Sequence, residues 1–190
     1  MSHRPLDPPP RRRSGAPERG ALPDGVRMLA RRPLTRAEVR SRLLARGHAE
    51  AEVEEALGRL AGTGALDDAA LARHWVEVRS ARKGHGPRRL VRELEARGVD
   101  PETVRRALSD AVESDAVDLG DVLRREAEKR VRGLGSRRDR RAYARVYNAL
   151  LRAGFEPGGI HEALTTHFSG SGEAQDDAPD GTGTQDHDLE

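Results

Sequence analysis

Three stretches of the chain repeat one pattern of apolar and polar positions around a glycine. The copies are residues 39–57, 90–108 and 146–164, which align on Gly47, Gly98 and Gly154. Apolar residues stand eight and four positions before each glycine and six, nine and ten positions after it. Steps of three and four residues are typical of one helix face, and a glycine suits the left-handed conformation that commonly ends a helix. Each copy therefore predicts a helix, a glycine stop, a short turn and a second helix.

A further helix is expected before each copy, because apolar residues recur there at helical spacing as well. In residues 67–83 the apolar face consists of Leu71, Trp75 and Val78, with Ala72 and Val76 beside it. A helix over residues 115–132 shows a similar stripe, and a shorter stretch before the first copy places Val26 and Leu29 at apolar positions.

Helix start signals agree with this pattern. Thr35 and Glu38 are spaced as a capping box ahead of the first copy. Asp100 followed by a proline is typical of an N-cap and a first helical turn. Two further prolines suit the same first-turn position, Pro87 and Pro157.

These elements predict an all-α chain, an elongated array of three tandem three-helix modules. The expected modules are residues 21–63, 64–114 and 115–168. The aligned glycines are 51 and 56 residues apart, a period that fits helical modules burying their apolar faces partly against neighbours. The Pro- and Arg-rich arm 1–20 and the acidic tail 169–190 offer too little apolar surface to offset the entropy cost of ordering, so both are expected to be disordered.

Composition excludes several classes of function. The chain of 190 residues has no cysteine, which excludes a disulfide framework and a thiolate zinc site. No apolar run approaches the length of a membrane span and no signal peptide is visible, so we expect a cytoplasmic protein without a membrane partner. The seven histidines are scattered, and neither a phosphate-binding loop nor a Ser-His-Asp arrangement is recognisable. We therefore expect no enzyme activity, no metal and no cofactor.

Positive charge is concentrated where the first helix of a module turns into the second, although the net charge is only +2. The second module carries an uninterrupted basic set, Arg79, Arg82, Lys83, Arg88, Arg89 and Arg92. The equivalent set of the third module, from Arg124 to Arg145, contributes the further candidates Arg124, Arg125, Arg137, Arg138, Arg140 and Arg141, and also includes Lys129, Arg130 and Arg132. Positive charge that recurs at the same place in successive modules suits the binding of a phosphate backbone, or of a partner filament that contains a phosphate backbone.

Solvated surface is the alternative interpretation of each single arginine, because basic residues also suit the last turn of a helix. Recurrence in phase favours binding for the clusters as a whole. Trp75 is interpreted as a core residue. The chain has only five aromatic residues, and this small number argues against a dedicated single-strand binder that stacks bases. The seven acidic residues of the tail either compete with phosphate for the basic clusters or serve only as a solubilising appendage.

The stretch GALDDAALARHWVEVRSARKGHGPRRLVRELEARGV, residues 64–99, resembles the signature of the bacterial RecX proteins, regulators of the RecA recombinase. The upstream LARRPLTRAEVRSRLLARG resembles the opening module of the same family, and the resemblance extends over residues 25–165. The matching positions are Gly64, Leu66, Asp68, Leu71, Ala72, Arg79, Gly86, Arg89, Leu90, Glu93, Leu94 and Gly98. Leu71 replaces a phenylalanine that is usual in the family, and neither the basic arm nor the acidic tail belongs to its pattern.

The resemblance implies a non-enzymatic protein of tandem three-helix repeats that binds RecA, above all its filament on DNA. Members generally restrain the ATPase, strand exchange and co-protease activities of RecA in recombination, DNA repair and the SOS response, and some bind DNA. Our first hypothesis is a monomeric modulator of the RecA filament. The alternative is a DNA-binding helical repeat protein that affects RecA only by competing for DNA, and a third hypothesis is a protein-only scaffold.

Overall fold

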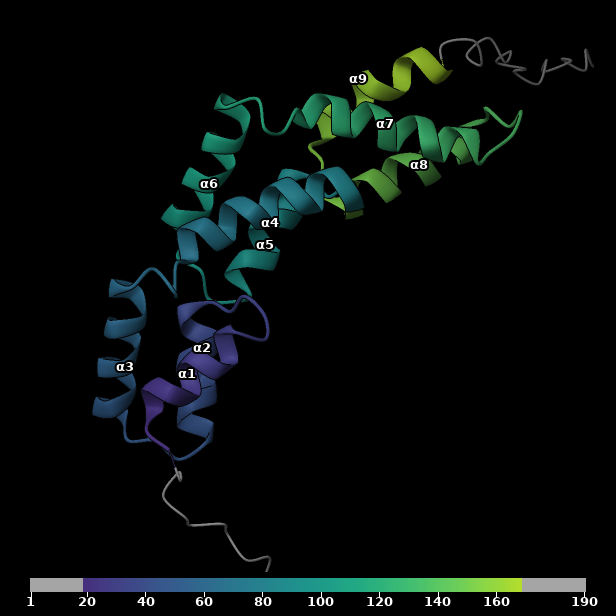
Figure 1. The fold of residues 1–190 in the computed structure, drawn as a ribbon. Helices are drawn as coiled ribbons and strands as arrows, with labels where there is room; N and C mark the ends of the chain where they lie inside the picture. The colour runs from purple at the N-terminus through teal and green to yellow at the C-terminus, as the bar shows by residue number, and fades with distance from the viewer. Residues whose placement is uncertain (1–18, 169–190) are drawn as a thin grey trace, which may run out of the picture.

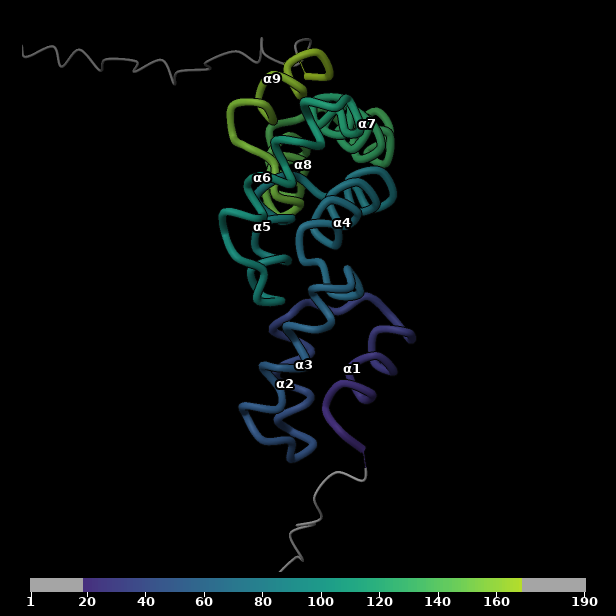
Figure 2. The backbone as a smooth tube through the Cα atoms, turned by 60° about the vertical axis from the view of Figure 1, so that its left-hand side comes forward, coloured from purple at the N-terminus to yellow at the C-terminus, as the bar shows by residue number. Residues whose placement is uncertain are grey.

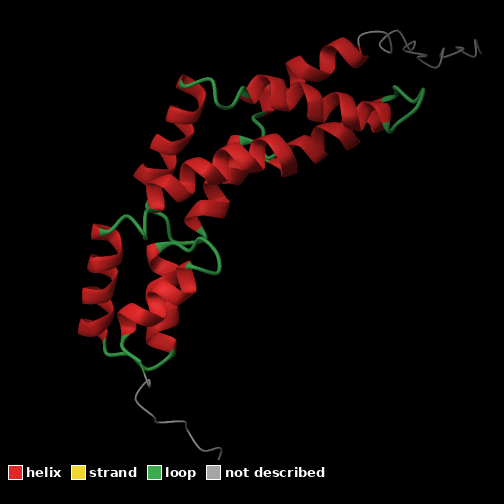
Figure 3. Cartoon of the chain, viewed as in Figure 1, coloured by secondary structure: helices red, strands yellow, loops and turns green. Residues whose placement is uncertain are grey.

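The computed structural model describes residues 19–168, and in this range it is helical throughout, without β-strands (Figure 1, Figure 3). The first three helices are α1 (Ala21–Leu29), α2 (Arg36–Ala45) and α3 (Glu50–Gly62). The next three are α4 (Asp68–Lys83), α5 (Pro87–Glu95) and α6 (Pro101–Glu113), followed by α7 (Leu119–Arg132), α8 (Arg140–Ala153) and α9 (Pro157–Phe168). The all-α prediction is confirmed. Apart from residues 19 and 20, the two predicted arms lie outside the described residues.

The repeat alignment is confirmed at its key positions. The three aligned glycines each follow a helix end with a positive φ, namely 90° at Gly47, 77° at Gly98 and 95° at Gly154. The apolar residues six positions later are fully buried, at 0% exposure for Val53, Val104 and Ile160. A side chain at the glycine positions would be strained, because L-residues rarely adopt this backbone conformation.

Most helix starts follow the predicted local signals. The Thr35 hydroxyl accepts a hydrogen bond from the Glu38 amide at 3.1 Å, and the Glu38 carboxylate accepts one from the Thr35 amide at 3.0 Å, which completes the capping box. Asp100 caps α6 by accepting a hydrogen bond from the amide of Thr103 at 3.0 Å. Proline is the first residue of three helices, α5, α6 and α9.

One predicted start was wrong. The helix expected from Asp115 begins at Leu119, because Asp118 caps it by accepting a hydrogen bond from the amide of Asp121 at 2.8 Å. Asp115 instead has a φ of 55° in the preceding turn.

The apolar face of α1 also differs from the prediction. Leu29 packs against the core of the first three helices as predicted, but Val26 is 51% exposed, and the buried residues of α1 are Ala21, Gly25 and Met28. The reason lies in the partner helix, since a Cβ at Gly25 would lie only 2.8 Å from the Leu60 side chain of α3. Close approach of the two helices therefore selects the small residues of α1.

Buried apolar residues form two separate cores. The smaller lies among α1, α2 and α3 and includes Val39, Leu43, Val53 and Leu57. The larger is shared by α4 to α9 and includes Leu90, Leu94, Leu150, Ile160 and Leu164. Figure 2 shows α1–α3 at one end of the elongated chain and α7–α9 at the other.

The last six helices are joined by backbone contacts as well as by their core. The Gly86 amide donates to the carbonyl of Ala153 at 2.8 Å, and the Arg88 amide donates to that of Gly154 at 3.0 Å. Helix α4 also contacts α7 directly. The sequence predicted that every three-helix set shares apolar surface with its neighbour. The structure shows a shared core only between α4–α6 and α7–α9, whereas α1–α3 has a core of its own.

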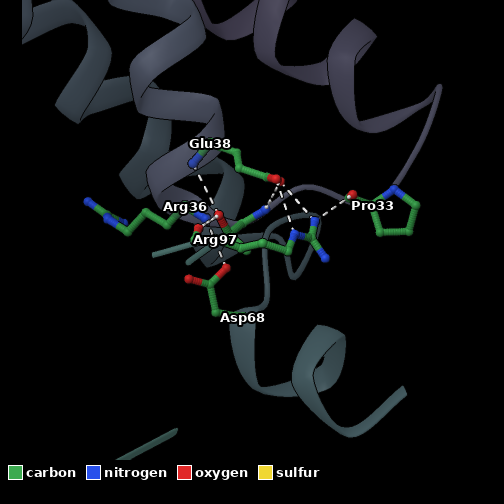
Figure 4. A network of polar contacts seen from close by, with 6 residues as sticks. Pro33, Arg36, Glu38, Asp68 and Arg97 are labelled. Carbon is green, nitrogen blue, oxygen red and sulfur yellow. Dashed lines mark hydrogen bonds and ion pairs between the residues drawn. The ribbon is translucent and has the colours of Figure 1, made fainter. Parts of the chain in front are cut away.

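The junction between α1–α3 and the following helices is polar and centres on Arg97 (Figure 4). The Arg97 guanidinium donates to the two carboxylate oxygens of Glu38 at 2.8 and 3.1 Å, and to the Pro33 carbonyl at 3.3 Å. The Arg97 carbonyl accepts a hydrogen bond from the Thr35 hydroxyl at 2.6 Å. Hydrogen bonds and an ion pair, rather than shared apolar surface, therefore set the position of the first three helices.

Burial and charge pairing have opposite effects on the pKa values of the two acids at this junction. Burial alone would raise the pKa of Glu38, but its bonds with Arg97 and with the Thr35 amide outweigh it and hold the pKa below its ordinary value. Asp68 accepts a hydrogen bond from the Arg36 amide at 2.9 Å. Burial nevertheless raises the pKa of Asp68. The ionised Glu38–Arg97 pair is thus the main electrostatic link across the junction.

Candidate binding surface

Helix α4 presents its largest apolar side chains to a groove at the edge of the larger core, against which Leu71 and Trp75 also pack. The groove, named here the α4 groove, has a volume of about 980 Å³ and runs between α4 and the first three helices. Leu71, Trp75 and Val78 line it, although the sequence placed them on the core face. The residues of α4 that are buried are Ala72, Val76 and Ser80. Small side chains on this face allow α4 to pack closely on α6, which explains the rotation of the helix.

Trp75 packs against the larger core at its edge and is only partly buried. Its indole N–H donates to Glu93 of α5 at 3.1 Å. The guanidinium carbons of Arg79 and Arg97 lie 4.2 and 4.7 Å from the centroid of the ring, a distance at which a cation is attracted to an aromatic face. Arg79 is therefore held on Trp75 at the floor of the α4 groove.

Glu93 connects two of the predicted residues to this tryptophan. It accepts a hydrogen bond from Arg89 at 2.9 Å and lies 3.1 Å from the Nδ1 atom of buried His85. Burial would raise the pKa of Glu93, but the bonds from Arg89 and Trp75 lower it. Burial lowers the pKa of His85, and the nearby Glu93 carboxylate only partly offsets this effect. His85 is therefore neutral at pH 7 in the folded protein.

We expect acid to destabilise the protein through His85. Because the folded-state pKa lies below the unfolded value of 6.5, the unfolded chain binds the proton more readily, so the contribution of neutral His85 is complete above pH 6.5 and falls as the pH drops below it. Urea unfolding followed by Trp75 fluorescence between pH 7.5 and pH 5.5 measures the effect. His85→Gln should flatten this dependence, and an unchanged slope in the variant would remove His85 as its source.

Ion pairing separates the predicted basic residues into two groups. Several are neutralised by a neighbouring acid: Arg88 by Glu156, Arg89 by Glu93, and both Arg124 and Arg125 by Asp121. Arg138 instead donates to the backbone carbonyls of Gly135 and Arg137. Among residues 19–168, no acid lies within ion-pair distance of a second group, Arg79, Arg82, Lys83, Arg92, Arg137, Arg140 and Arg141. The unneutralised charge is therefore found mainly at the end of α4 and at the start of α8.

The end of α4 and the side of α7 form a second, smaller groove. It has a volume of about 470 Å³, and we name it the α4–α7 groove. Helix α7 contributes the basic residues Arg125, Lys129 and Arg132 and the acidic residues Glu126 and Glu128 to its lining. Ser80, Ala81 and Gly84 of α4 form the opposite wall, and Arg82 and Lys83 are exposed in the same last turn. Arg82 and Lys83 line the α4 groove, and the basic residues that line the α4–α7 groove all come from the cluster of the third module.

The remaining predicted residues lie elsewhere. Arg88, Arg89 and Arg92 belong to α5, and the segment from Arg137 to Arg141 lies at the turn between α7 and α8, the end of these helices remote from α6 (Figure 1). Sequence reasoning gave no role to Arg97, which lines the α4 groove and links the first three helices to the rest. The only sequence feature that singles out Arg97 is its position directly before Gly98 in the repeat. That position does not indicate which acid the arginine pairs with.

Comparisons with known proteins agree with this architecture. Residues 24–60 match the family described as "RecX, first three-helix domain", and residues 67–108 match "RecX, second three-helix domain". The regulatory protein RecX of Chromohalobacter salexigens is 37% identical over 141 residues, which cover 74% of this chain and 88% of that protein. The chain belongs to the RecX family. The RecX protein of Thermus thermophilus is 48% identical over 105 residues, which cover 55% of this chain and 70% of that protein. The RecX protein of Mycobacterium avium is 34% identical over 153 residues, which cover 78% of this chain and 84% of that protein.

Solved structures share the fold of this RecX chain. The crystal structure of RecX from Lactobacillus salivarius has a TM-score of 0.69 at 19% identity and covers 78% of this chain and 94% of its own. A second crystal structure of a regulatory protein RecX has a TM-score of 0.64 at 21% identity, covering 75% and 70%. In the part of the chain that the structure describes, no helix is long and apolar enough to cross a membrane, and no group of acidic and histidine side chains is placed to hold a metal.

Proposed function

We propose that this RecX protein binds the RecA filament on DNA as a cytoplasmic monomer and restrains its ATPase, recombinase and co-protease activities without catalysing a reaction itself. Family membership carries the proposal, since the relatives are named regulatory proteins. The elongated arrangement of the helices supports it, because an extended chain can contact several subunits of a filament (Figure 1). Arg82 and Lys83 of the α4 groove and Arg132 of the α4–α7 groove have no acid within ion-pair distance among residues 19–168, and they supply charge that suits the phosphates of the bound DNA.

RecA ATP hydrolysis on single-stranded DNA tests the proposal directly. We expect the rate to fall when this protein is added at less than one molecule per RecA subunit, because one bound molecule restrains several subunits. The cognate RecA and a folded, full-length chain are required. An unchanged rate at a molar excess of the protein would contradict the regulatory role.

A DNA-binding protein that only competes with RecA for DNA is the second candidate function. The observation that favours it is the absence of an acidic partner, among the described residues, for Arg82 and Lys83, which line the α4 groove, and for Arg132, which lines the α4–α7 groove. Order of addition separates the two functions. A competitor acts when it is added before RecA and loses its effect on a preformed filament, whereas a filament modulator acts in both orders.

The salt dependence of DNA binding should respond to these three residues. Each phosphate contact contributes a slope of about 0.9 to the fall of log affinity with log salt on duplex DNA. We therefore expect the triple variant Arg82→Ser, Lys83→Ser and Arg132→Ser to bind DNA more weakly, with a slope smaller by up to about 3. Arg88 and Arg89 are left intact, because they pair with Glu156 and Glu93 and position α5.

A matched control removes the same charge from another surface. Arg59, Arg73 and Arg152 are exposed on α3, α4 and α8, line neither groove, and have no acid within ion-pair distance among residues 19–168. Replacing them with serine should leave the salt slope close to that of the natural chain. Equal losses in the two triple variants would show that net charge, and not the place of Arg82, Lys83 and Arg132, governs DNA binding. Fluorescence anisotropy of a labelled oligonucleotide across a salt series measures both.

A further inference from the structure

The α4 groove combines an apolar floor with a basic rim. The floor consists of Leu29, Leu34, Leu71, Trp75 and Val78, which come from α1, the loop after it and α4. The rim is formed by the basic side chains Arg32, Arg79, Arg82, Lys83 and Arg97. Leu71, Trp75 and Val78 are each partly exposed, so the floor remains accessible from the open side of the groove.

Of the basic residues on this rim, the two acids that line the groove neutralise only Arg97. Glu38 is held by Arg97 through two hydrogen bonds. Asp67 caps α4 by accepting a hydrogen bond from the amide of Ala70 at 2.8 Å. Arg82 and Lys83 have no acidic neighbour within ion-pair distance among residues 19–168. The groove therefore offers apolar contact below and uncompensated positive charge at its edge.

We propose that the α4 groove docks a segment of a protein partner that is apolar on one face and acidic on the other. The apolar face covers the aliphatic part of the floor, at Leu71 and Val78, and the acidic face meets Arg82 and Lys83. Charge complementarity of this kind fixes the orientation of the segment and excludes basic competitors. The inference rests on the proposed function, because the segment belongs to a protein subunit of the filament that is regulated.

A protein segment fits the groove better than a nucleic acid does. Two guanidinium groups already lie over the Trp75 ring, so a base that stacked there would have to displace at least one of them. The rest of the floor is aliphatic, whereas sites that bind single strands stack successive bases on aromatic side chains. Aliphatic floors take up aliphatic and aromatic side chains of proteins instead.

The acidic tail of this chain is a poorer occupant than a partner protein. Residues 169–190 contain seven acids, but Leu189 is their only large apolar residue. Such a segment supplies charge for the rim and almost nothing to cover the floor. The tail also follows α9, which lies at the end of the chain remote from the first three helices (Figure 1, Figure 2).

Site-specific photocrosslinking tests the occupant, since the chain has no cysteine of its own. His74→Cys places a benzophenone label at an exposed position that lines the α4 groove. Arg73→Cys is the matched control, because this neighbouring exposed residue lies on the other flank of α4, beside Glu102 and Arg106 of α6. Each labelled full-length chain is irradiated with cognate RecA filaments on single-stranded DNA.

We expect the label at position 74 to crosslink to filament protein at a yield at least fivefold above that at position 73. Mass spectrometry should place the crosslink in a segment that carries both apolar and acidic residues. Crosslinks to DNA, to residues 169–190 of the same chain, or to a segment without acidic residues would each overturn the proposal. Equal yields at the two positions would overturn it as well.

A negative charge introduced into the groove provides a second, independent measurement. Val78→Glu puts a carboxylate on the floor opposite the acidic segment, and we expect about a tenfold loss of affinity for the filament from like-charge repulsion. Val112→Glu makes the same change at a valine of α6 that is 46% exposed outside the groove, and should bind as the natural chain does. Helical content measured by circular dichroism checks that both variants are folded.

The outcomes separate this inference from the proposed function. If the natural chain lowers the RecA ATPase while Val78→Glu is equally potent and position 74 gives no excess crosslink, the docking site is overturned and the regulatory role stands. If the natural chain fails to lower the ATPase, the regulatory role falls, and the docking site falls with it.

Discussion

Gly86→Val is expected to lower the free energy of unfolding by about 3 kcal/mol, because a side chain at this position collides with backbone. A Cβ at Gly86 would lie 2.6 Å from the carbonyl carbon of Gly154 and 2.7 Å from the amide nitrogen of Phe155. Neither atom can move aside as the end of a flexible side chain could. The Gly86 amide also donates to the Ala153 carbonyl at 2.8 Å, so the two segments cannot separate without losing this bond.

Backbone strain does not contribute to this expected effect. Gly86 has φ −81° and ψ 168°, a conformation that any residue adopts. The loss therefore measures the close approach of the loop after α4 to the loop after α8. Urea unfolding followed by circular dichroism and by Trp75 fluorescence gives the change in free energy.

Gly58 provides the matched control for a glycine replaced in this chain. It lies inside α3, and a Cβ there would meet no atom within 4 Å. Gly58→Ala should raise the free energy of unfolding by about 0.5–1 kcal/mol, because alanine loses less backbone entropy in a helix. If Gly86→Val were as stable as the natural chain, the contact between the two loops would be looser than the structure describes.

Truncation of the two cores is expected to affect two different unfolding transitions. Leu150→Ala should cost about 3–4 kcal/mol, the usual size for a leucine removed from a packed core. Leu150 is fully buried in the core shared by α4 to α9. Leu43 is fully buried in the separate core of α1–α3, and Leu43→Ala should destabilise that unit by a similar amount. The polar junction at Arg97 couples the two units weakly, because no buried apolar core is shared across it.

Two spectroscopic probes distinguish the transitions. Trp75 is the only tryptophan and packs against the larger core, so the main change in its fluorescence follows the loss of that core, whereas far-ultraviolet circular dichroism reports on all helices. Leu150→Ala should shift the fluorescence transition, and Leu43→Ala should shift only a part of the circular dichroism change. If both variants shifted both probes equally, the described helices would unfold as one cooperative unit.

The sequence by itself determined the features that depend on neighbours along the chain. The glycine stops at Gly47, Gly98 and Gly154 and the capping box at Thr35 need only residues within one helical turn. The buried positions of the repeated helix pairs were equally readable, because residues three and four apart share a helix face whatever the tertiary structure. The family motif within residues 64–99 then indicated RecX, which the comparisons confirmed.

Only the tertiary structure decided which face of α4 is buried. Its sequence offers two adjacent apolar stripes, and the larger one, with Leu71, Trp75 and Val78, was the natural choice for a core. The rotation of a helix about its axis depends on the helix it packs against. Close packing on α6 selects the small stripe through Ala72 and Val76, and leaves the larger stripe to line the α4 groove.

The same holds for charge and for the division into two cores. Whether an arginine is neutralised depends on acids far away in the sequence, as Arg88 with Glu156 and Arg97 with Glu38 show. The α4–α7 groove likewise joins residues from helices that are separate in the chain. Periodicity along a sequence fixes local geometry, whereas ion pairs, grooves and shared cores arise from distances between segments, and only the folded chain defines these distances.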